Sequence, residues 1–414
     1  MRPDVEAKSV RIVDPAMRRA DHKPRKQPKW GARSNQTTVG RWFWETDRLL
    51  LLMVAILIAI GLIAVAAASP AAAERLSGGK VQFAPLRFFF QQLMWIAVAL
   101  PVMIAVSMLP KTMARRLAIA GAIVCTIMLM LVPVIGMEKN GAVRWIDFGI
   151  TAIQPSEFLK PLYVVSIAWL LSLKRKDPSL PMVMISGLIT AVLAFALMRQ
   201  PNLGETVIFA LTFVALLTLS GAHLRYLYML GGAGAGALVL AYFFYPVATQ
   251  RINGFLFDEG DSGQTDAALE TLTSGGLFGL GPGAGTRKFD LPEPHTDYIF
   301  SVIGEEFGMI ACLAIAILYL TIIARVLIRM LGEEDLFTIL AAGGLVIQIG
   351  LQAVINMAVN VHLLPSKGMT LPFISYGGSS LIALSIGFGL LLAFTRRNPY
   401  LHRSPYVVRW SGRE

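Results

Sequence analysis

Apolar residues gather in ten stretches that are each long enough to cross a membrane. A helix that spans a hydrocarbon core about 30 Å thick needs about 20 mostly apolar residues. Because lipid offers no hydrogen-bond partners to bare backbone amides, each stretch is expected to be helical. The stretches lie near residues 48–68, 88–109, 114–136, 156–173, 181–198, 204–221, 225–246, 298–328, 336–360 and 378–396. The pattern predicts an all-α polytopic membrane protein with about ten transmembrane helices.

Composition agrees with this class of protein. Hydrophobic residues make up 55% of the 414 residues and charged residues 15%, which excludes an ordinary soluble domain. Three regions are expected: a disordered basic cytoplasmic tail over 1–46, a transmembrane domain over 47–398 and a cytoplasmic tail over 399–414. The two cysteines, Cys125 and Cys312, fall inside predicted spans, so they indicate neither a disulfide framework nor a metal site.

Lysine and arginine in the connecting loops predict the orientation, because cytoplasmic loops carry an excess of them. Basic residues mark the N-terminal tail and every second loop, and they alternate with the loops near 137–155, 199–204, 247–297 and 361–377. Both termini are therefore expected in the cytoplasm. A large extracytoplasmic loop is expected between the seventh and eighth helices.

The formal net charge of +11 raises the question of nucleic-acid binding. The basic tail stands directly before the first span, however, where such residues set topology and contact anionic lipid. We therefore expect membrane lipids, and no nucleic acid, among the partners.

Ionisable residues inside the predicted spans are candidates for function, because a charge in lipid is costly. Glu157 and Lys160 stand three residues apart, so they share a helix face and can form an ion pair. A structural pair and a role in substrate binding are both open. Glu305 and Glu306 stand one to two turns into the eighth span, where at least one is expected to face the protein interior or a wet cavity.

The loop 247–297 ends in LTSGGLFGLGPGAGTRKFDLPEPHTD, which is rich in glycine and then basic. Glycine lets backbone amides approach an anion, and Arg287 with Lys288 adds positive charge. Without the GK[ST] of a Walker loop, this is a weak phosphate signal. Two interpretations remain for the end of the stretch. Either Thr296 or Asp297 caps the next helix, or Asp297 is a functional carboxylate at the membrane surface.

Five motifs give the chain a resemblance to a known family. They read GAVRWIDFG, QPSEFLK, RQPNLGET, LPEPHTDYIFSVIGEEFG and LLPSKGMTLPFISYGGSSL, in this order along the chain. Together they resemble the SEDS family, which contains FtsW, RodA and SpoVE. Within the family, PSKGMTLPFISYGGSS and the long basic tail are most similar to the FtsW members of cell division.

The resemblance implies a peptidoglycan glycosyltransferase of the bacterial inner membrane at the division septum. Family members polymerise lipid II, an undecaprenyl-pyrophosphate-linked disaccharide-pentapeptide, into glycan strands. They act with a class B penicillin-binding protein as transpeptidase. For FtsW this partner is FtsI, in a divisome that also contains FtsQ, FtsL, FtsB and FtsN.

The implied chemistry needs a base and cations. The 4-hydroxyl of the acceptor attacks the anomeric carbon of a donor whose leaving group is a lipid pyrophosphate. The family's essential acid in the HTD motif falls on Asp297, which is expected to be the general base. A divalent cation, Mg²⁺ or Mn²⁺, is expected by resemblance, but no spacing in the sequence identifies its ligands.

The remaining site residues are candidates for binding the substrate. Three basic residues on separate external loops are expected to converge on the pyrophosphates: Arg144, Lys288 and Lys367. Three residues are expected to shape the site around the base: Glu293, His295 and Glu306. The intramembrane candidates are Glu157 and Lys160.

One departure from the family pattern concerns charge. Where the family usually reads QPD, this chain has Gln200, Pro201 and Asn202, so a carboxylate is missing at the start of the sixth span. Glu205 follows three residues later and can supply the charge from one helical turn away. A second departure, at Arg287, adds a positive charge before the LPE motif.

Two small-residue segments are interpreted as structural. Residues 377–380 are expected to let the last helix start close to a neighbour. The GGAGAG run at 231–236 suits close helix contact or a lipid-facing groove.

Two other functions stay open on the sequence. A lipid II flippase needs a hydrophilic path, so Glu157, Lys160 and Glu305 would matter more than the loop acid. A non-catalytic divisome scaffold would depend on no single loop charge. An extracytoplasmic base favours the polymerase, because a transporter has no need of one there.

Overall fold

The structure is a computed structural model. It describes residues 38–77, 82–139, 142–147, 149, 152–177, 179–244, 249, 252–254, 263–366 and 368–396. Most of the two predicted tails, at 1–37 and 397–414, lies outside the described residues. The chain divides after Glu45 into two units, and the first contributes helix α1 (Thr38–Glu45). This end of the tail is therefore helical, where the sequence predicted disorder.

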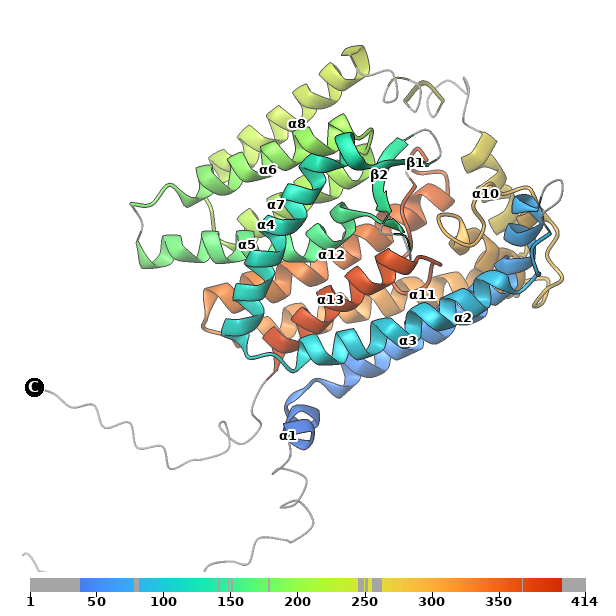
Figure 1. Ribbon diagram of the computed structural model, residues 1–414, viewed down its shortest axis with the longest axis horizontal. Coiled ribbons are helices and arrows are strands. Elements are labelled where there is room, and N and C mark those ends of the chain that lie inside the picture. Colours follow the sequence, from blue (N-terminus) through green and yellow to red (C-terminus); the bar gives the residue numbers. More distant parts are fainter. Residues whose placement is uncertain are drawn as a thin grey trace, which may run out of the picture. The chain divides into compact units, whose positions relative to one another are not determined.

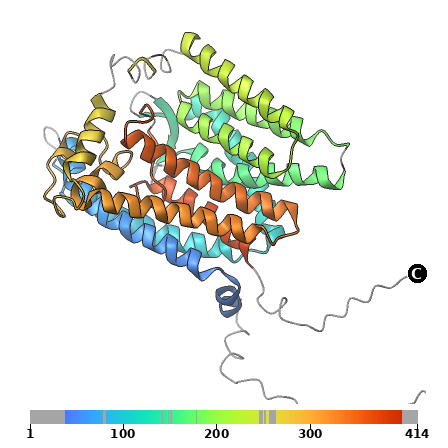
Figure 2. The same cartoon turned by 180° about the vertical axis from the view of Figure 1, so that it is seen from behind.

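Ten apolar helices make up most of the described part of the second unit (Figures 1 and 2). They are α2 (Arg48–Leu76), α3 (Arg87–Ser107), α4 (Lys111–Ile135), α5 (Pro155–Lys176), α6 (Met182–Arg199), α7 (Leu203–Leu219), α8 (Leu224–Phe244), α11 (Ile299–Met330), α12 (Leu336–Asn360) and α13 (Gly378–Thr395). Among the described residues, nine of them are long and apolar enough to cross a membrane, and α7, with 17 residues, is shorter. The predicted polytopic helical fold is confirmed.

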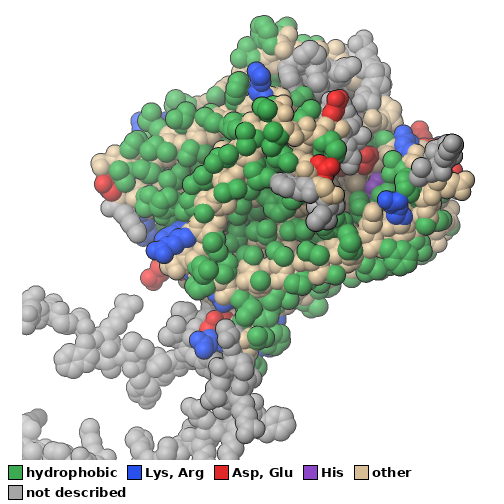
Figure 3. Space-filling view, in the orientation of Figure 1, with side chains coloured by type: hydrophobic (Ala, Val, Ile, Leu, Met, Phe, Trp, Pro, Cys, Tyr) green, Lys and Arg blue, Asp and Glu red, His purple; other side chains and the backbone are tan. Residues whose placement is uncertain are grey.

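The interior of this bundle is formed by α12 and α13, which are buried along most of their length and pack against α5. On the face in Figure 3, apolar side chains cover most of the described surface. That surface suits contact with lipid tails, because apolar atoms need no hydrogen bonds from the lipid.

The two small-residue segments behave differently. A Cβ added to Gly378 would lie 2.4 Å from the Trp95 ring, so the predicted close start of α13 is confirmed. Helix α8 is exposed along its apolar length and lies at the edge of the bundle (Figure 1). Its glycines at 231–236 have no described neighbour within 4 Å, so the described residues do not show a close helix contact there.

A small antiparallel sheet lies between α4 and α5. Strand β1 (Met137–Lys139) pairs with β2 (Ala142–Asp147), and β2 pairs with β3 (Ala152–Ile153). The helical prediction missed these strands. An Asn-Gly pair, a strong sequence signal for a hairpin, separates the first two in the sequence.

Helix α11 is interrupted near its external end. Gly308 has φ 82° and ψ 172°, which is not a helical conformation. The preceding glycine-rich loop pairs with the backbone around the break. The amide of Leu280 donates to the carbonyl of Glu305 at 2.9 Å, and the amide of Met309 donates to the carbonyl of Gly276 at 3.0 Å. These backbone groups are therefore satisfied inside the protein, as membrane depth requires.

The external loop between α12 and α13 dips into the bundle. Gly61 stands about 13 residues, and so about 20 Å, into α2. A Cβ added to Gly61 would lie 2.7 Å from the backbone of Ile374. Phe373 has φ 63°, a conformation that bulky residues rarely adopt. The hydroxyl of Tyr319 donates to the carbonyl of Pro372, which helps to hold this irregular segment inside the bundle.

Asp47 joins the cytoplasmic ends of α2 and α11. Its carboxylate accepts a hydrogen bond from the amide of Leu49 at 3.1 Å and two from Arg325 at 2.9 and 3.0 Å. Arg329 binds the same carboxylate. Burial raises the pKa of Asp47, but the hydrogen bond from Arg325 and the charges of both arginines outweigh burial and hold the pKa below its usual range. The carboxylate is therefore ionised at neutral pH.

Replacing Asp47 by asparagine is expected to lower thermal stability, because two arginines then face a neutral group. Breaking a largely buried ion pair from one side costs about 3 kcal/mol. The unfolding midpoint of the purified protein in detergent measures the effect. Asp177→Asn is the control, since Asp177 is an exposed loop acid that bonds to Ser179. Equal losses of stability in both variants would contradict a stabilising role for the ion pairs of Asp47.

Candidate active site

The segment before α11 is fastened to the loop between α12 and α13. The Thr296 hydroxyl donates to the Glu293 carboxylate at 2.7 Å and closes a turn. The amide of Tyr376 donates to the carbonyl of His295 at 2.9 Å. The hydroxyl of Ser375 donates to the carbonyl of Thr296 at 2.6 Å. Two loops that are about 80 residues apart in sequence therefore form one external surface.

Asp297 lies where these loops meet. The side-chain amides of Asn356 and Asn360 donate to its backbone carbonyl at 2.9 and 3.0 Å. The residue is partly exposed. A Cβ added to Gly368 would lie 3.4 Å from its Oδ2, so the α12–α13 loop passes beside the carboxylate. The main chain of Asp297 is thus fixed from inside the bundle.

The capping interpretation is wrong for this helix. Helix α11 begins at Ile299, and its N-cap is Tyr298, which makes no side-chain capping hydrogen bond. The Tyr298 hydroxyl is 3.1 Å from Ser366 Oγ and 3.3 Å from Gln264 Oε1. Neither Thr296 nor Asp297 is the cap, and Asp297 stands one residue before the N-cap.

His295, two residues before Asp297 in the chain, has a packed aromatic side chain. It is 6% exposed, and its ring centroid lies 4.3 Å from that of Phe88 and 5.2 Å from that of Tyr376. Its role in shaping the site stays a prediction, and so does its contact with substrate.

An amide stripe on α12 contacts the site from inside the bundle. Four amide side chains recur at every fourth position of this apolar helix and therefore share one face: Gln348, Gln352, Asn356 and Asn360. All four are buried. Asn356 also donates to the carbonyl of Met369 at 2.6 Å, which ties the stripe to the α12–α13 loop.

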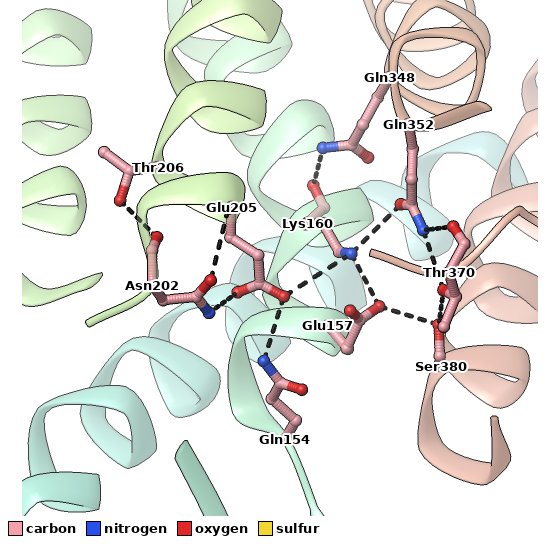
Figure 4. A network of polar contacts seen from close by, with 10 residues as sticks. All are labelled: Gln154, Glu157, Lys160, Asn202, Glu205, Thr206, Gln348, Gln352, Thr370 and Ser380. Atoms are coloured by element: carbon pink, nitrogen blue, oxygen red, sulfur yellow. Dashed lines mark hydrogen bonds and ion pairs between the residues drawn. The ribbon is translucent and has the colours of Figure 1, made fainter. Parts of the chain in front are cut away.

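Lys160 lies at the centre of a buried ion network that Figure 4 shows. Its ammonium is 2.8 Å from Glu157 Oε2, 3.8 Å from Glu205 Oε1 and 3.2 Å from Gln352 Oε1. Gln352 in turn donates to the carbonyl of Thr370 at 3.0 Å. The predicted Glu157–Lys160 pair is confirmed. The network connects it to the loop beside Asp297.

The carboxylate missing from position 202 is supplied by Glu205. The Asn202 side-chain amide donates to Glu205 Oε2 at 2.8 Å, and Asn202 is also the N-cap of α7. Gln154 donates to Glu205 Oε1 at 3.2 Å. Glu205 on α7 and Glu157 on α5 therefore share the Lys160 ammonium, as Figure 4 shows.

Lys288 and Glu306 form a separate buried ion pair. Lys288 is 2% exposed and binds the Glu306 carboxylate and, at 3.1 Å, the carbonyl of Ala67. The Glu305 carboxylate accepts hydrogen bonds from the backbone amides of Arg287 and Lys288 at 2.7 and 3.0 Å. Both glutamates thus face the protein interior. The described contacts of Lys288 are internal, and its contact with pyrophosphate stays a prediction.

The other predicted cations have different positions. Arg144, in β2, donates to the carbonyls of Gln200, at 3.1 Å, and Pro201. It therefore fastens the external sheet to the turn before α7. Lys367 lies outside the described residues. Among the residues that the structure does describe, no three metal-binding side chains come together.

The sequence contained a signal for the residues that were missed. Amides at i, i+4, i+8 and i+12 of an apolar span mark a face that cannot meet lipid, and they accompany the ionisable residues of other spans. Ser380 was interpreted as structural, yet its hydroxyl donates to Glu157 Oε2 at 3.1 Å. The amides of α12 fix the backbone of Asp297, and an acid carried by a fixed segment at the membrane surface suits proton transfer.

The chain matches a family model described as "Cell cycle protein", for FtsW, RodA and SpoVE, over residues 47–400. It is 37% identical over 369 residues to a "Probable peptidoglycan glycosyltransferase FtsW" of Caulobacter vibrioides, covering 89% of this chain and 94% of that protein. It is 32% identical to "Stage V sporulation protein E" of Bacillus subtilis, covering 86% and 98%.

Two solved structures have the same fold. One, described as "Structural coordination of polymerization and crosslinking by a peptidoglycan synthase complex", superposes with a TM-score of 0.70 at 26% identity over 84% of this chain and 97% of that one. The rod shape determining protein RodA of Thermus thermophilus gives a TM-score of 0.63 at 26% identity over 84% and 96%. This multi-pass membrane protein belongs to the SEDS family of FtsW, RodA and SpoVE.

Proposed function

We propose that this protein is a peptidoglycan glycosyltransferase that joins lipid II disaccharide units into glycan strands. One observation carries the proposal: Asp297 is a partly exposed acidic residue on the external side, and two buried amides of α12 hold its backbone carbonyl. A positioned base is what sugar transfer needs. Similar proteins that are named as probable peptidoglycan glycosyltransferases support the same reaction.

In the proposed reaction, Asp297 takes the proton of the acceptor's 4-hydroxyl as that oxygen attacks the anomeric carbon of the donor. The glycosidic bond forms while the bond from that carbon to the pyrophosphate oxygen breaks. The lipid pyrophosphate leaves with the electron pair. A fixed main chain at Asp297 reduces the entropy that must be lost to align the base with the hydroxyl.

The departing pyrophosphate needs positive charge nearby. Arg144 and Lys367 are our candidates on the external side, the second from sequence alone. Lys288 can contact substrate only if its ion pair with Glu306 breaks. Because the described residues bring no three metal ligands together, we assign no step to the Mg²⁺ or Mn²⁺ that the resemblance implies. Hard divalent cations often bind through substrate phosphates and one or two carboxylates.

The intramembrane charges favour a polymerase over a flippase. A transport path needs a water-filled route past the ionisable groups. The cavity beside Glu157 and Lys160 has a volume of about 10 Å³, which is about the least that one water needs. Both charges are instead held by protein partners, so their role is to position the site.

We infer that the protein acts with a class B penicillin-binding protein, FtsI, at the division septum, together with FtsQ, FtsL, FtsB and FtsN. Support comes from the similar solved complex, which is described as coordinating polymerization and crosslinking. The FtsW name of the Caulobacter relative supports the septal location.

Asp297→Asn is expected to abolish polymerisation, because the amide cannot accept the hydroxyl proton. The assay follows fluorescent lipid II on gels with the purified protein and its cognate penicillin-binding protein. Asp290→Asn is the matched control, since it makes the same chemical change at an exposed acid in the same loop. Polymer formation by Asp297→Asn at the wild-type rate would remove the base assignment.

A non-catalytic scaffold predicts that Asp297→Asn changes neither polymer formation nor partner binding. The polymerase proposal predicts that the variant retains binding to the penicillin-binding protein in a pull-down while it loses polymer formation. If it loses both, the substitution has disturbed the fold, and the unfolding midpoint will show this.

Asn356→Ala is expected to lower the polymerisation rate by at least about tenfold, because a base moved by about 1 Å loses its alignment. Gln348→Ala is the matched control: it truncates an amide on the same stripe, and Gln348 donates to the carbonyl of Lys160 and not to the Asp297 segment. Similar rate losses in the two variants would indicate general destabilisation of α12.

Glu205→Gln is expected to weaken activity and stability, because Lys160 then keeps one carboxylate partner. The double variant Asn202→Asp with Glu205→Gln restores the charge of the cluster and reverses the polarity of the hydrogen bond between the two side chains. We expect it to recover most of the lost polymerisation rate and unfolding midpoint. A double variant no better than Glu205→Gln would show that position 205 itself is required.

A further inference from the structure

The loop between α10 (Gly263–Ser274) and the 3-10 turn η2 (Arg287–Phe289) has an unusual surface. It runs GGLFGLGPGAG over 275–285 and contains no charged residue. Its three large side chains are exposed: Leu277 by 63%, Phe278 by 81% and Leu280 by 50%. Contiguous exposed apolar side chains of this kind mark an interaction surface.

The backbone amides and carbonyls of this loop are hydrogen-bonded within the protein, although a loop in water could bond to water instead. Besides the Leu280–Glu305 and Met309–Gly276 hydrogen bonds, the amide of Gly281 donates to the carbonyl of Glu306 at 3.0 Å. The amide of Gly279 donates to the carbonyl of Gly275 at 2.8 Å. Irregular backbone survives at membrane depth only when protein satisfies its polar groups. The loop and the broken turn of α11 satisfy each other's backbone hydrogen bonds.

Counting residues places the loop at the outer edge of the hydrocarbon. The Asp47–Arg325 ion pair marks the cytoplasmic end of α11. A core about 30 Å thick corresponds to about 20 helical residues, which reaches back from Arg325 to about Glu305. Gly308 and the loop paired with it therefore lie just inside the outer boundary. Any tilt of α11 places them deeper.

The apolar side chains of the loop continue the lipid-facing stripe of α11. Ile310, Leu313, Ile317 and Leu320 on this helix are each at least half exposed. The amide of Ile310 donates to the carbonyl of Leu277 at 3.3 Å, so the loop begins where the stripe ends. The same lipid tails that cover the helix therefore meet the loop.

We propose that the loop 275–281 is a membrane anchor, with Leu277, Phe278 and Leu280 inserted among the acyl chains of the outer leaflet. It fixes the height of the segment that follows. The Glu305 carboxylate links α11 directly to the amides of Arg287 and Lys288. The anchor itself does not depend on the enzyme activity. The further claim, that the anchor sets the catalytic loop at the level of a lipid-linked pyrophosphate, rests on the proposed function.

Spin labels test the anchor without any activity assay. After Cys125 and Cys312 are replaced by alanine, a nitroxide is attached to cysteine at position 278 of the full chain. The protein is reconstituted in phosphatidylethanolamine and phosphatidylglycerol vesicles. Collision rates with oxygen, which concentrates in the membrane, and with a water-soluble nickel chelate report the depth. Leu313→Cys provides the lipid reference, and Glu270→Cys provides the water reference.

Phe278→Cys is expected to give an oxygen-to-nickel ratio close to that of position 313 and several-fold above that of position 270. A ratio equal to that at 270 would overturn the proposal, because the loop would then stand in water. Labels at 277 and 280 repeat the measurement, so failure of one variant to fold leaves the test intact. Loss of polymerisation by a variant whose label stays in lipid would bear on the enzyme proposal and leave the anchor standing.

Discussion

The amide stripe on α12 is the constraint on which the rest of the site depends. A polar group buried in a membrane protein must find its partner inside the protein, since lipid offers none. Gln352 joins Lys160 to the backbone of Thr370, and Asn356 joins Asp297 to Met369. Each unpaired buried group would cost about 1–3 kcal/mol, so movement of the loops away from this helix is opposed several times over. The position of the external carboxylate is therefore a property of the bundle interior.

The same rule explains why the chain breaks regular structure where it does. Gly308 interrupts α11 only because the loop at 276–281 bonds to the freed backbone. The α12–α13 loop descends to the level of Gly61 only because a glycine there leaves room for its backbone. In both places the absence of a side chain permits an approach that Cβ would prevent. Irregular segments thus enter the membrane without exposing polar backbone to lipid.

The sequence predicted what depends on local pattern. Ten apolar stretches became ten helices, and Glu157 with Lys160 paired as their spacing required. Contacts between distant segments were beyond that reasoning. The burial of Lys288 against Glu306 and the contact of Arg144 with the turn before α7 depend on which segments meet in space. The β1–β2 hairpin had a local signal in its Asn-Gly pair, which the helical prediction did not use. The four amides from Gln348 to Asn360 recur with a period that the sequence shows. The residues that they bind follow no such period, so the sequence does not identify them.

Charge conservation in the Lys160 cluster shows how the site tolerates sequence change. One buried cation is shared between two carboxylates, and removing the cation, or both carboxylates, would leave uncompensated charge far from water. Asn202 does not leave such a gap, because its amide binds Glu205, which faces the same lysine. The cluster needs a carboxylate within reach of Lys160 more than it needs one at a given position. Asp297 has no such freedom, because Asn356 and Asn360 bind its backbone carbonyl and so fix the point of the chain from which its carboxylate extends.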